Sequence, residues 1–239
     1  MKRGKDFIIF PLDVSTFDEA MRYVTLLKDQ VGLFKVGLEL FLSQGPEIIK
    51  AIRKQTSAGI FLDLKLHDIP ATVKRAFLAA SQFRPRFITI HCDEGDEILK
   101  SVAENNPGDT KIMAITVLTS LNPKKLKALG YGEKYVKDLS ALVLLKARMA
   151  KEAGCHGVVC SGHEVAMVKR ELGPDLIAIT PGIRPAWSVV KQDDQARIVT
   201  PSAAVKNGAD YIVVGRPIRD AEDPADAARK VAKEIESVL

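Results

Sequence analysis

A group of charged residues follows a strongly apolar stretch, where Asp63, Lys65 and Asp68 lie within six positions of one another. Residues two apart on a β-strand point to the same face, so Asp63 and Lys65 are predicted to project together. Asp68 lies just beyond the predicted strand, where a loop can turn its carboxylate back towards the amine. An ammonium group held between carboxylates can donate a proton and can stabilise negative charge that develops in a reaction.

The same charges can also form a surface salt bridge, which is common and contributes little. The intervening Leu62, Leu64 and Leu66 argue against that interpretation, because they indicate a strand covered by a helix layer on one side. Asp63 and Lys65 then face the other side of a parallel sheet, in a closed interior or at its rim. Charges in such places are paired and are usually functional.

The rest of the chain repeats a short apolar strand followed by an amphipathic helix, without a linker or a change of composition. The predicted strands span residues 7–12, 33–36, 60–66, 87–91, 111–118, 157–160, 176–180 and 211–214. The predicted helices span 16–27, 47–54, a segment starting at Pro70, 94–104, 138–153, 164–172 and 224–238, with an insertion at 122–135. This α/β alternation predicts one domain over residues 1–239, a closed (β/α)₈ TIM barrel. A doubly wound open sheet is the alternative, but no Gly-x-Gly-x-x-Gly follows the first strand.

In such barrels the chemistry lies at the carboxyl ends of the strands. Asp13 follows the first predicted strand, Lys35 projects from the second, and Asp63 and Lys65 come from the third. Two amines and at least two acids are therefore expected to converge on one mouth. Thr119 ends the fifth strand and can contact the polar edge of a ring, although hydroxyls at strand ends are also ordinary turn residues.

A phosphate site is predicted after the eighth strand, at Gly215 and Arg216, since the loops after strands seven and eight form this site in barrels. The glycine permits close backbone approach and the arginine offers a bidentate fork. The loop at 181–200 is unusually long for this chain and carries Arg184 and Gln195. It is predicted to act as a lid over the anion, with a solvated loop as the alternative.

Composition excludes several classes of protein. The formal charge of +5 is spread along the chain and aromatic residues make up 6%, which does not suit a nucleic-acid binder. Three cysteines without metal-ligand spacing, and four scattered histidines, predict reduced thiols and no zinc site. Without a signal-peptide core or an apolar run long enough for a bilayer, we expect a soluble cytoplasmic protein that makes no membrane contact.

Several motifs occur in order over essentially the whole chain: Asp63-x-Lys65-x-x-Asp68, Thr180-Pro-Gly-Ile-Arg184-Pro, Asp-Gln195-x-Arg and Val214-Gly-Arg216-Pro. Together they resemble the orotidine 5′-phosphate decarboxylase family. The resemblance implies a carboxy-lyase that converts orotidine 5′-monophosphate to UMP and CO₂ in de novo pyrimidine biosynthesis. It also implies that neither a metal nor an organic cofactor takes part.

The resemblance also implies a role for each residue of the motifs. Lys65 would protonate C6 of the pyrimidine within a catalytic group of Lys65, Asp63, Asp68 and Lys35. In a homodimer, Asp68 and Thr72 would reach into the site of the partner. The remaining implied contacts are Asp13 and Lys35 with the ribose, Thr119 with the pyrimidine, and Arg184, Gln195, Gly215 and Arg216 with the phosphate. The segment 187–193 is longer than the compact lid that the family pattern suggests.

Two other functions compete with this one. The magnesium-dependent 3-keto-gulonate 6-phosphate decarboxylases and hexulose phosphate synthases share the Asp-x-Lys-x-x-Asp motif, but they resemble this chain less at Lys35. An acid helps to bind their metal at that position, and an ammonium group there repels Mg²⁺. A catalytically silent, nucleotide-binding barrel is the second alternative, because a fold alone does not establish activity.

Overall fold

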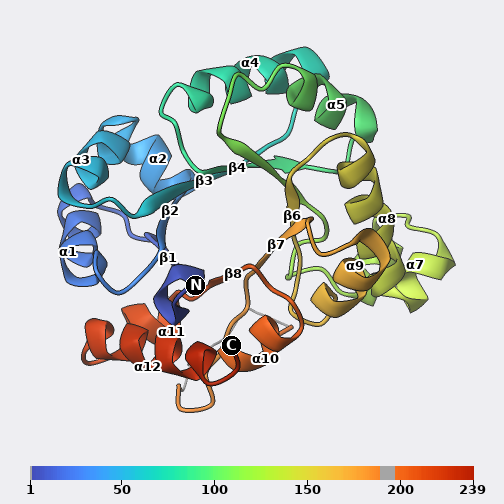
Figure 1. Cartoon of the computed structure of the whole chain (residues 1–239). Helices are drawn as coiled ribbons and strands as arrows, with labels where there is room; N and C mark the ends of the chain where they lie inside the picture. Colours follow the sequence, from blue (N-terminus) through green and yellow to red (C-terminus); the bar gives the residue numbers. More distant parts are fainter. Residues whose placement is uncertain (1, 189–196) are drawn as a thin grey trace.

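Eight parallel strands, β1 to β8 in sequence order, form a closed barrel in the computed structural model, which describes residues 2–188 and 197–239. The strands are β1 (Ile8–Pro11), β2 (Leu33–Gly37), β3 (Gly59–Leu66), β4 (Phe87–His91), β5 (Lys111–Ile115), β6 (Gly157–Val159), β7 (Ile177–Thr180) and β8 (Tyr211–Val213). Because β1 pairs with β8, the sheet has no open edge. Figure 1 shows the ring of strands inside a ring of helices.

Many helices of the outer ring begin at a side-chain cap or a proline. Thr16, for example, accepts a hydrogen bond from the backbone N–H of Glu19 at the start of α1. The helices are η1 (Gly4–Phe7, a 3₁₀ turn), α1 (Phe17–Leu27), α2 (Leu38–Gln44), α3 (Glu47–Gln55), α4 (Pro70–Ser81), α5 (Asp96–Glu104), α6 (Pro123–Ala128), α7 (Glu133–Lys137), α8 (Leu139–Glu152), α9 (Val165–Leu172), α10 (Pro201–Lys206), α11 (Arg216–Arg219) and α12 (Pro224–Glu236).

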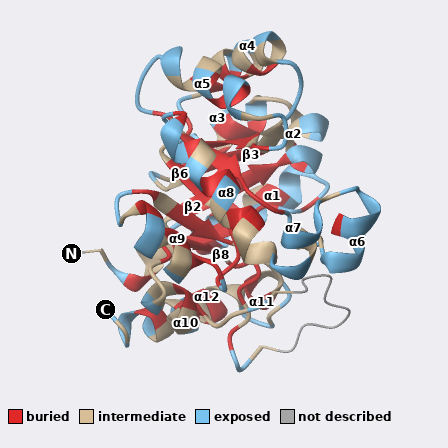
Figure 2. Cartoon of the chain, turned by 90° about the vertical axis from the view of Figure 1, so that its right-hand side faces the viewer, coloured by how far each residue is buried: buried red, intermediate tan, exposed pale blue. Residues whose placement is uncertain are grey.

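The apolar core has two parts, one on each side of the sheet. The larger part fills the space between the strands and the helices, and the buried strands and inner helix faces are visible in Figure 2. The smaller part fills the lower barrel with inward-facing side chains from successive strands: Ile9, Leu33, Phe61, Phe87, Met113, Ile179 and Tyr211. This packed plug closes the barrel below the layer that carries the charged residues, because Asp63 follows Phe61 by two positions on the same face.

The closed barrel confirms the fold predicted from the sequence, whereas several element boundaries differ. The strand predicted at 111–118 ends at Ile115, and Phe7 belongs to a 3₁₀ turn instead of the first strand. The insertion at 122–135 contains α6 and part of α7, which project from the barrel in Figure 2. Helices of four to seven residues, such as α2 and α11, are too short to show the periodicity that predicts a helix from sequence.

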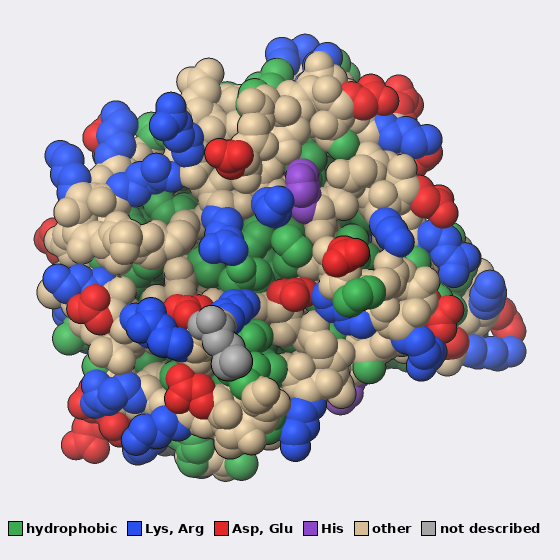
Figure 3. Space-filling model, in the orientation of Figure 1, with side chains coloured by type: hydrophobic (Ala, Val, Ile, Leu, Met, Phe, Trp, Pro, Cys, Tyr) green, Lys and Arg blue, Asp and Glu red, His purple; other side chains and the backbone are tan. Residues whose placement is uncertain are grey.

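Charged side chains are mixed on the face of the barrel that carries the N-terminal residues. Figure 3 shows Lys and Arg scattered among Asp and Glu there, around a hydrophobic centre. This face therefore shows no continuous basic stripe of the kind that tracks a nucleic-acid backbone. None of the described helices is long and apolar enough to cross a membrane.

Gly157 allows β6 to approach β7 closely, and we predict that Gly157→Ala destabilises the barrel. A methyl group at this position would lie 2.3 Å from the carbonyl oxygen of Ile177 and 2.6 Å from Cε of Met113. Overpacking of this kind costs about 1–3 kcal/mol of unfolding free energy, which urea denaturation can measure. Gly108→Ala is the matched control, because its added methyl group would meet nothing within 4 Å. Equal stability of the two variants would contradict this account of β6 packing.

Candidate active site

Strand β3 departs from regular geometry where it carries the acid and the amine. Leu62 pairs with Ile88 of β4, but the next pair joins Leu66 to Ile90, so that β3 contains two more residues than β4 over this stretch. Lys65 lies within this bulge and has a positive φ of 49°. A positive φ is uncommon for a residue other than glycine and marks a position that the surrounding structure holds in place.

The hydroxyl of Thr89 fixes the bulge to the neighbouring strand. It accepts a hydrogen bond from the backbone N–H of Lys65 at 2.8 Å and donates one to Oδ1 of Asp63 at 3.0 Å. The second carboxylate oxygen of Asp63 accepts a bond from Nζ of Lys65 at 2.7 Å. Both predicted residues therefore face the barrel interior, and a completely buried threonine orients both of them.

Charges of alternating sign continue from Asp63 to the first strand. Nζ of Lys35 lies 3.6 Å from Asp63 and donates a hydrogen bond to Asp13 at 2.8 Å. A side chain at Gly37 would lie 3.0 Å from this ammonium group, so the glycine leaves room for the contact. The four residues form a row, Asp13–Lys35–Asp63–Lys65, in which each carboxylate contacts one or two ammonium groups.

Burial and pairing act in opposite directions on the two inner members of this row. Burial alone would lower the pKa of Lys35, but the carboxylates of Asp63 and Asp13 outweigh it, and the pKa is raised. Burial would likewise raise the pKa of Asp63, but Lys35 and Lys65, with the hydrogen bonds from Lys65 and Thr89, lower it. Both groups therefore stay charged at neutral pH, because each has two oppositely charged neighbours.

Two adjoining cavities open beside this row and share the side chains of Lys35, Pro181 and Val213. The first, of about 190 Å³, contains Asp63 and Lys65 against apolar walls, and Thr119 is among its lining residues. The second, of about 420 Å³, contains the cationic side chains of Lys35, Arg184, Arg216 and Arg219, together with Asp13 and Gly215. A ligand spanning both would place a flat, largely apolar group beside Lys65 and an anion beside the arginines.

Gly215 lies at the point where β8 leads into α11, as the phosphate-site prediction requires. A side chain there would lie 3.0 Å from Cγ of Pro11, so the glycine permits the first and last strands to converge at the cavity wall. The guanidinium of Arg184, on the other wall, donates to the carbonyl of its neighbour Ile183 at 2.9 Å. Arg219 was not anticipated from the sequence, and a second arginine in the Gly-Arg-Pro-Ile-Arg segment is the signal that could have identified it.

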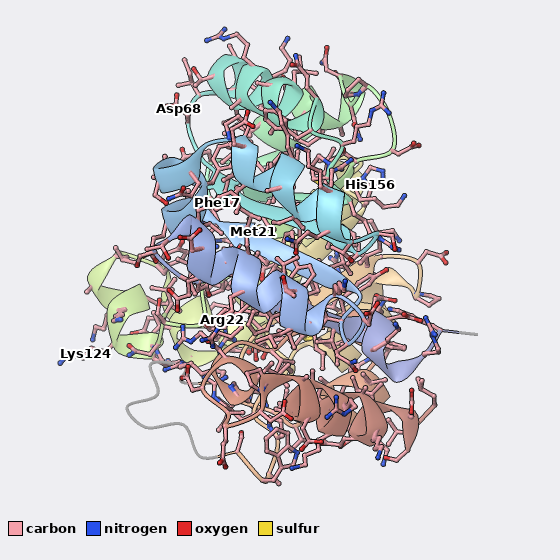
Figure 4. All side chains as sticks on the ribbon, turned by 90° about the vertical axis from the view of Figure 1, so that its left-hand side faces the viewer. Phe17, Met21, Arg22, Asp68, Lys124 and His156 are labelled. Carbon is pink, nitrogen blue, oxygen red and sulfur yellow. The ribbon has the colours of Figure 1, made fainter. Side chains whose placement is uncertain are left out.

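Asp68 and Thr72 do not join this network within one chain, contrary to the expectation that a loop turns Asp68 back to the amine. Oδ1 of Asp68 accepts a bond from the backbone N–H of Ile69, and the side chain lines a separate cavity with His67 and Glu94. Figure 4 shows Asp68 at the edge of the molecule opposite the N-terminal end. Three residues, His67 to Ile69, separate the end of β3 from Pro70, where α4 begins. Gln195 lies outside the described residues, as does most of the 187–193 segment and with it the central part of the predicted lid.

Thr89 is the main site residue that the sequence patterns do not predict. Its signal was a single polar residue at an inward-facing position of Phe87-Ile-Thr89-Ile-His91, beside Asp63 on the next strand. A threonine in a strand is ordinary by composition. Only the register between β3 and β4 shows that its hydroxyl contacts both Asp63 and Lys65.

The family model and relatives of similar sequence point to the same protein family. The model of the family described as Orotidine 5′-phosphate decarboxylase / HUMPS matches residues 6–231. The orotidine 5′-phosphate decarboxylase of Desulfosudis oleivorans is 48% identical over 236 residues, which cover 98% of this chain and 95% of the relative. The enzyme of the same name from Thermobifida fusca is 43% identical over 96% of this chain and 95% of its own length.

Solved structures agree with the sequence relatives. The crystal structure of orotidine 5′-phosphate decarboxylase from Lactobacillus acidophilus superimposes with a TM-score of 0.81 at 33% identity. The match covers 95% of this chain and 98% of that one. The residues matched by the family model, 6–231, include all eight strands of the barrel.

The lowered pKa of Asp63 gives a test of the row itself, by carboxyl NMR of wild type and Lys35→Met. In the wild type the Asp63 carboxyl should titrate below its ordinary value of 3.8. Its contribution to stability is therefore present above that value and is lost as pH falls through the folded-state pKa. Lys35→Met removes one of the two cations but not the burial, so the Asp63 pKa should rise. An unchanged Asp63 titration in Lys35→Met would show that Lys35 does not hold the carboxylate charged.

Proposed function

The chain belongs to the orotidine 5′-phosphate decarboxylase / HUMPS family, and we propose that it decarboxylates orotidine 5′-monophosphate to UMP and CO₂. The row Asp13–Lys35–Asp63–Lys65 is the observation that carries this proposal, because it ends in an ammonium group that points into a small cavity beside a cationic one. The reaction would supply UMP in de novo pyrimidine biosynthesis. We also propose that residues 1–239 form one catalytic domain.

The two adjoining cavities suit the two ends of this nucleotide. The pyrimidine would occupy the cavity of Lys65 and Thr119, and the phosphate would lie among Arg184, Arg216 and Gly215. Lys35 lines both cavities, and Asp13, which accepts its hydrogen bond, lines the cationic one; these two side chains would bind the ribose hydroxyl groups. Arginine suits the phosphate end, because its planar fork can donate two parallel hydrogen bonds to phosphate oxygens.

The chemistry needs a charge stabiliser and a proton donor at the same atom. When the bond from C6 to the carboxylate breaks, its electron pair stays at C6, where no cofactor accepts it. The ammonium group of Lys65 would stabilise that charge and then transfer its proton to C6, leaving a neutral amine that solvent reprotonates. Asp63 fixes the direction of the ammonium group through the 2.7 Å contact, so that little reorganisation is required during the reaction.

The magnesium-dependent enzymes that share the Asp-x-Lys-x-x-Asp motif are the competing possibility. The ammonium group of Lys35 argues against that alternative in this chain. It lies 2.8 Å from Asp13 and 3.6 Å from Asp63, in the position between two carboxylates that a divalent cation would need. The metal-free reaction is therefore the better match for these residues.

We further propose a homodimer in which Asp68 and Thr72 complete the partner's site. Asp68 is exposed in the isolated chain, and its neighbour Ile69 leaves 66% of its surface uncovered at the same end of the barrel. We propose a cytoplasmic location because all three cysteines are unpaired and buried.

Replacement of Lys65 by methionine should abolish decarboxylation while leaving the fold intact. Loss of both the charge stabilisation and the proton donor is expected to lower kcat by at least about 10⁴-fold. The measurement is the loss of orotidine 5′-monophosphate absorbance in EDTA. Lys169→Met is the matched control, since Lys169 pairs with Asp210 at 2.6 Å but lies outside both cavities, and it should keep wild-type activity. Wild-type turnover that requires Mg²⁺, or an active Lys65→Met, would overturn the proposal.

Mixing two inactive variants tests the shared site. If Asp68 acts in the partner's site, then in a mixed dimer of Lys65→Met and Asp68→Ala one site carries both changes and the other carries neither. Random exchange of equal amounts should therefore restore about a quarter of the wild-type sites. Each variant incubated alone is the control. No recovery despite subunit exchange, demonstrated with differently tagged subunits, would place Asp68 in its own chain's site or outside the mechanism.

A further inference from the structure

A buried ion pair lies just behind the cavity wall and belongs to none of the groups described so far. Glu164, at the start of α9, accepts a hydrogen bond from the guanidinium of Arg197, the first described residue after the 181–188 segment. The exposed fractions of these side chains are 3% and 13%. We propose that Glu164 and Arg197 are positioning residues, which hold the phosphate-binding wall of the site in place without contacting the substrate. The inference rests on the proposed function.

The connection from Arg197 to the phosphate wall runs through Val199. Val199 forms an isolated parallel bridge with Ile183. The backbone N–H of Arg184 donates to the carbonyl of Val199 at 2.9 Å, and that of Val199 donates to Gly182 at 3.2 Å. Arg197 lies two residues before Val199 and therefore holds the bridge between Val199 and Ile183 in place. Arg184, the residue after Ile183, lines the cationic cavity.

Close packing against the loop after β6 strengthens this connection. A side chain at Gly162 would lie only 2.3 Å from Cγ2 of Val199, so the loop that carries Glu164 packs directly on the bridge. On the other side, Nη2 of Arg197 reaches the carbonyl of Val117 at 3.5 Å. That contact is at the limit of hydrogen-bond length, so the main effect of the pair is expected on the phosphate wall.

Stability alone is a poor explanation for this pair. Among the described residues, Oε2 of Glu164 and Nε of Arg197 are buried without a hydrogen-bond partner. Removing two charges from water is costly, and a buried pair with unsatisfied atoms often contributes less than an apolar pair of similar size. Neither side chain belongs to the described lining of the two cavities. Their position behind Val199 and Arg184 then suggests that their role is to set geometry.

The proposal makes the effect of the pair depend on the substrate's phosphate. Binding energy from a group remote from the reacting bond can assist the reaction only if that group is held in the right place. Displacement of the wall that carries Arg184 should therefore lower kcat/KM for the nucleotide, orotidine 5′-monophosphate. The same displacement should leave kcat/KM for the nucleoside, orotidine, almost unchanged, because orotidine has no phosphate for that wall to hold.

The experiment compares both substrates in Glu164→Gln, in Arg197→Met and in the double variant. We expect kcat/KM for orotidine 5′-monophosphate to fall by about 10- to 100-fold in each, and kcat/KM for orotidine to change by less than about threefold. Because the pair acts as a unit, the double variant should be no worse than either single one. The double variant leaves no buried unpaired charge, so its two kcat/KM values can still be compared if a single variant folds poorly.

Two further variants separate positioning from a structural role. Arg197→Lys keeps the charge and should recover part of the nucleotide activity that Arg197→Met loses. Asp210→Asn removes the partner of Lys169 in another partly buried ion pair, away from the cavities, and should lower stability without a change in either kcat/KM. An equal loss for both substrates, or variants that lose only thermal stability, would overturn the proposal.

Binding of UMP distinguishes failure of this inference from failure of the proposed function. The dissociation constant for UMP, measured by calorimetry, should rise about tenfold in the double variant. An inactive wild type that still shows this difference would contradict the decarboxylase activity but support the positioning role. Unchanged UMP affinity in the variants of an active wild type would contradict the positioning role alone.

Discussion

Mutual neutralisation of buried charges is the constraint on which this site depends. Lys35 and Asp63 are both largely removed from water, and each keeps its charge there because oppositely charged side chains lie beside it. Alternation along Asp13–Lys35–Asp63–Lys65 keeps every contact attractive. One end of this row is half exposed at Asp13, and the other end is the ammonium group of Lys65 in the cavity. The row therefore delivers a fixed positive charge to an apolar cavity, which an isolated lysine could not do.

The barrel provides the geometry that this neutralisation requires. Three adjacent strands bring the row together, and the apolar plug beneath it, formed by residues such as Phe61 and Phe87, supports it from below. The bulge in β3 advances Lys65 towards the cavity while Thr89 holds its backbone. Positive φ at Lys65 is thus a local cost that the neighbouring strand offsets, and such strain is typical of functional positions.

The sequence predicted the closed barrel and most of the charged row, because both follow from simple periodicities. Asp63 and Lys65 are two residues apart, and that spacing places them on one face even though the strand bulges between Leu62 and Leu66. Thr89 and the Glu164–Arg197 pair could not be predicted in the same way. Their contacts depend on register between strands and on loop packing, which no single segment encodes. Asp68 shows that closeness in sequence does not ensure contact. It lies three residues after Lys65, but its carboxylate does not reach the amine within one chain.

The central claim is that the amine at position 65 both stabilises and protonates the reacting carbon, and chemical replacement of that amine tests it most directly. Burial raises the pKa of the Cys155 and Cys160 thiols to about 12 and that of Cys92 as well, so a new thiol in Lys65→Cys should be alkylated selectively. The account predicts that Lys65→Cys is inactive. Aminoethylation of the thiol should restore turnover, with the alkaline limb of the pH–rate profile moved to lower pH because the new amine is less basic. Restored turnover with an unmoved profile, or an active variant before alkylation, would contradict it.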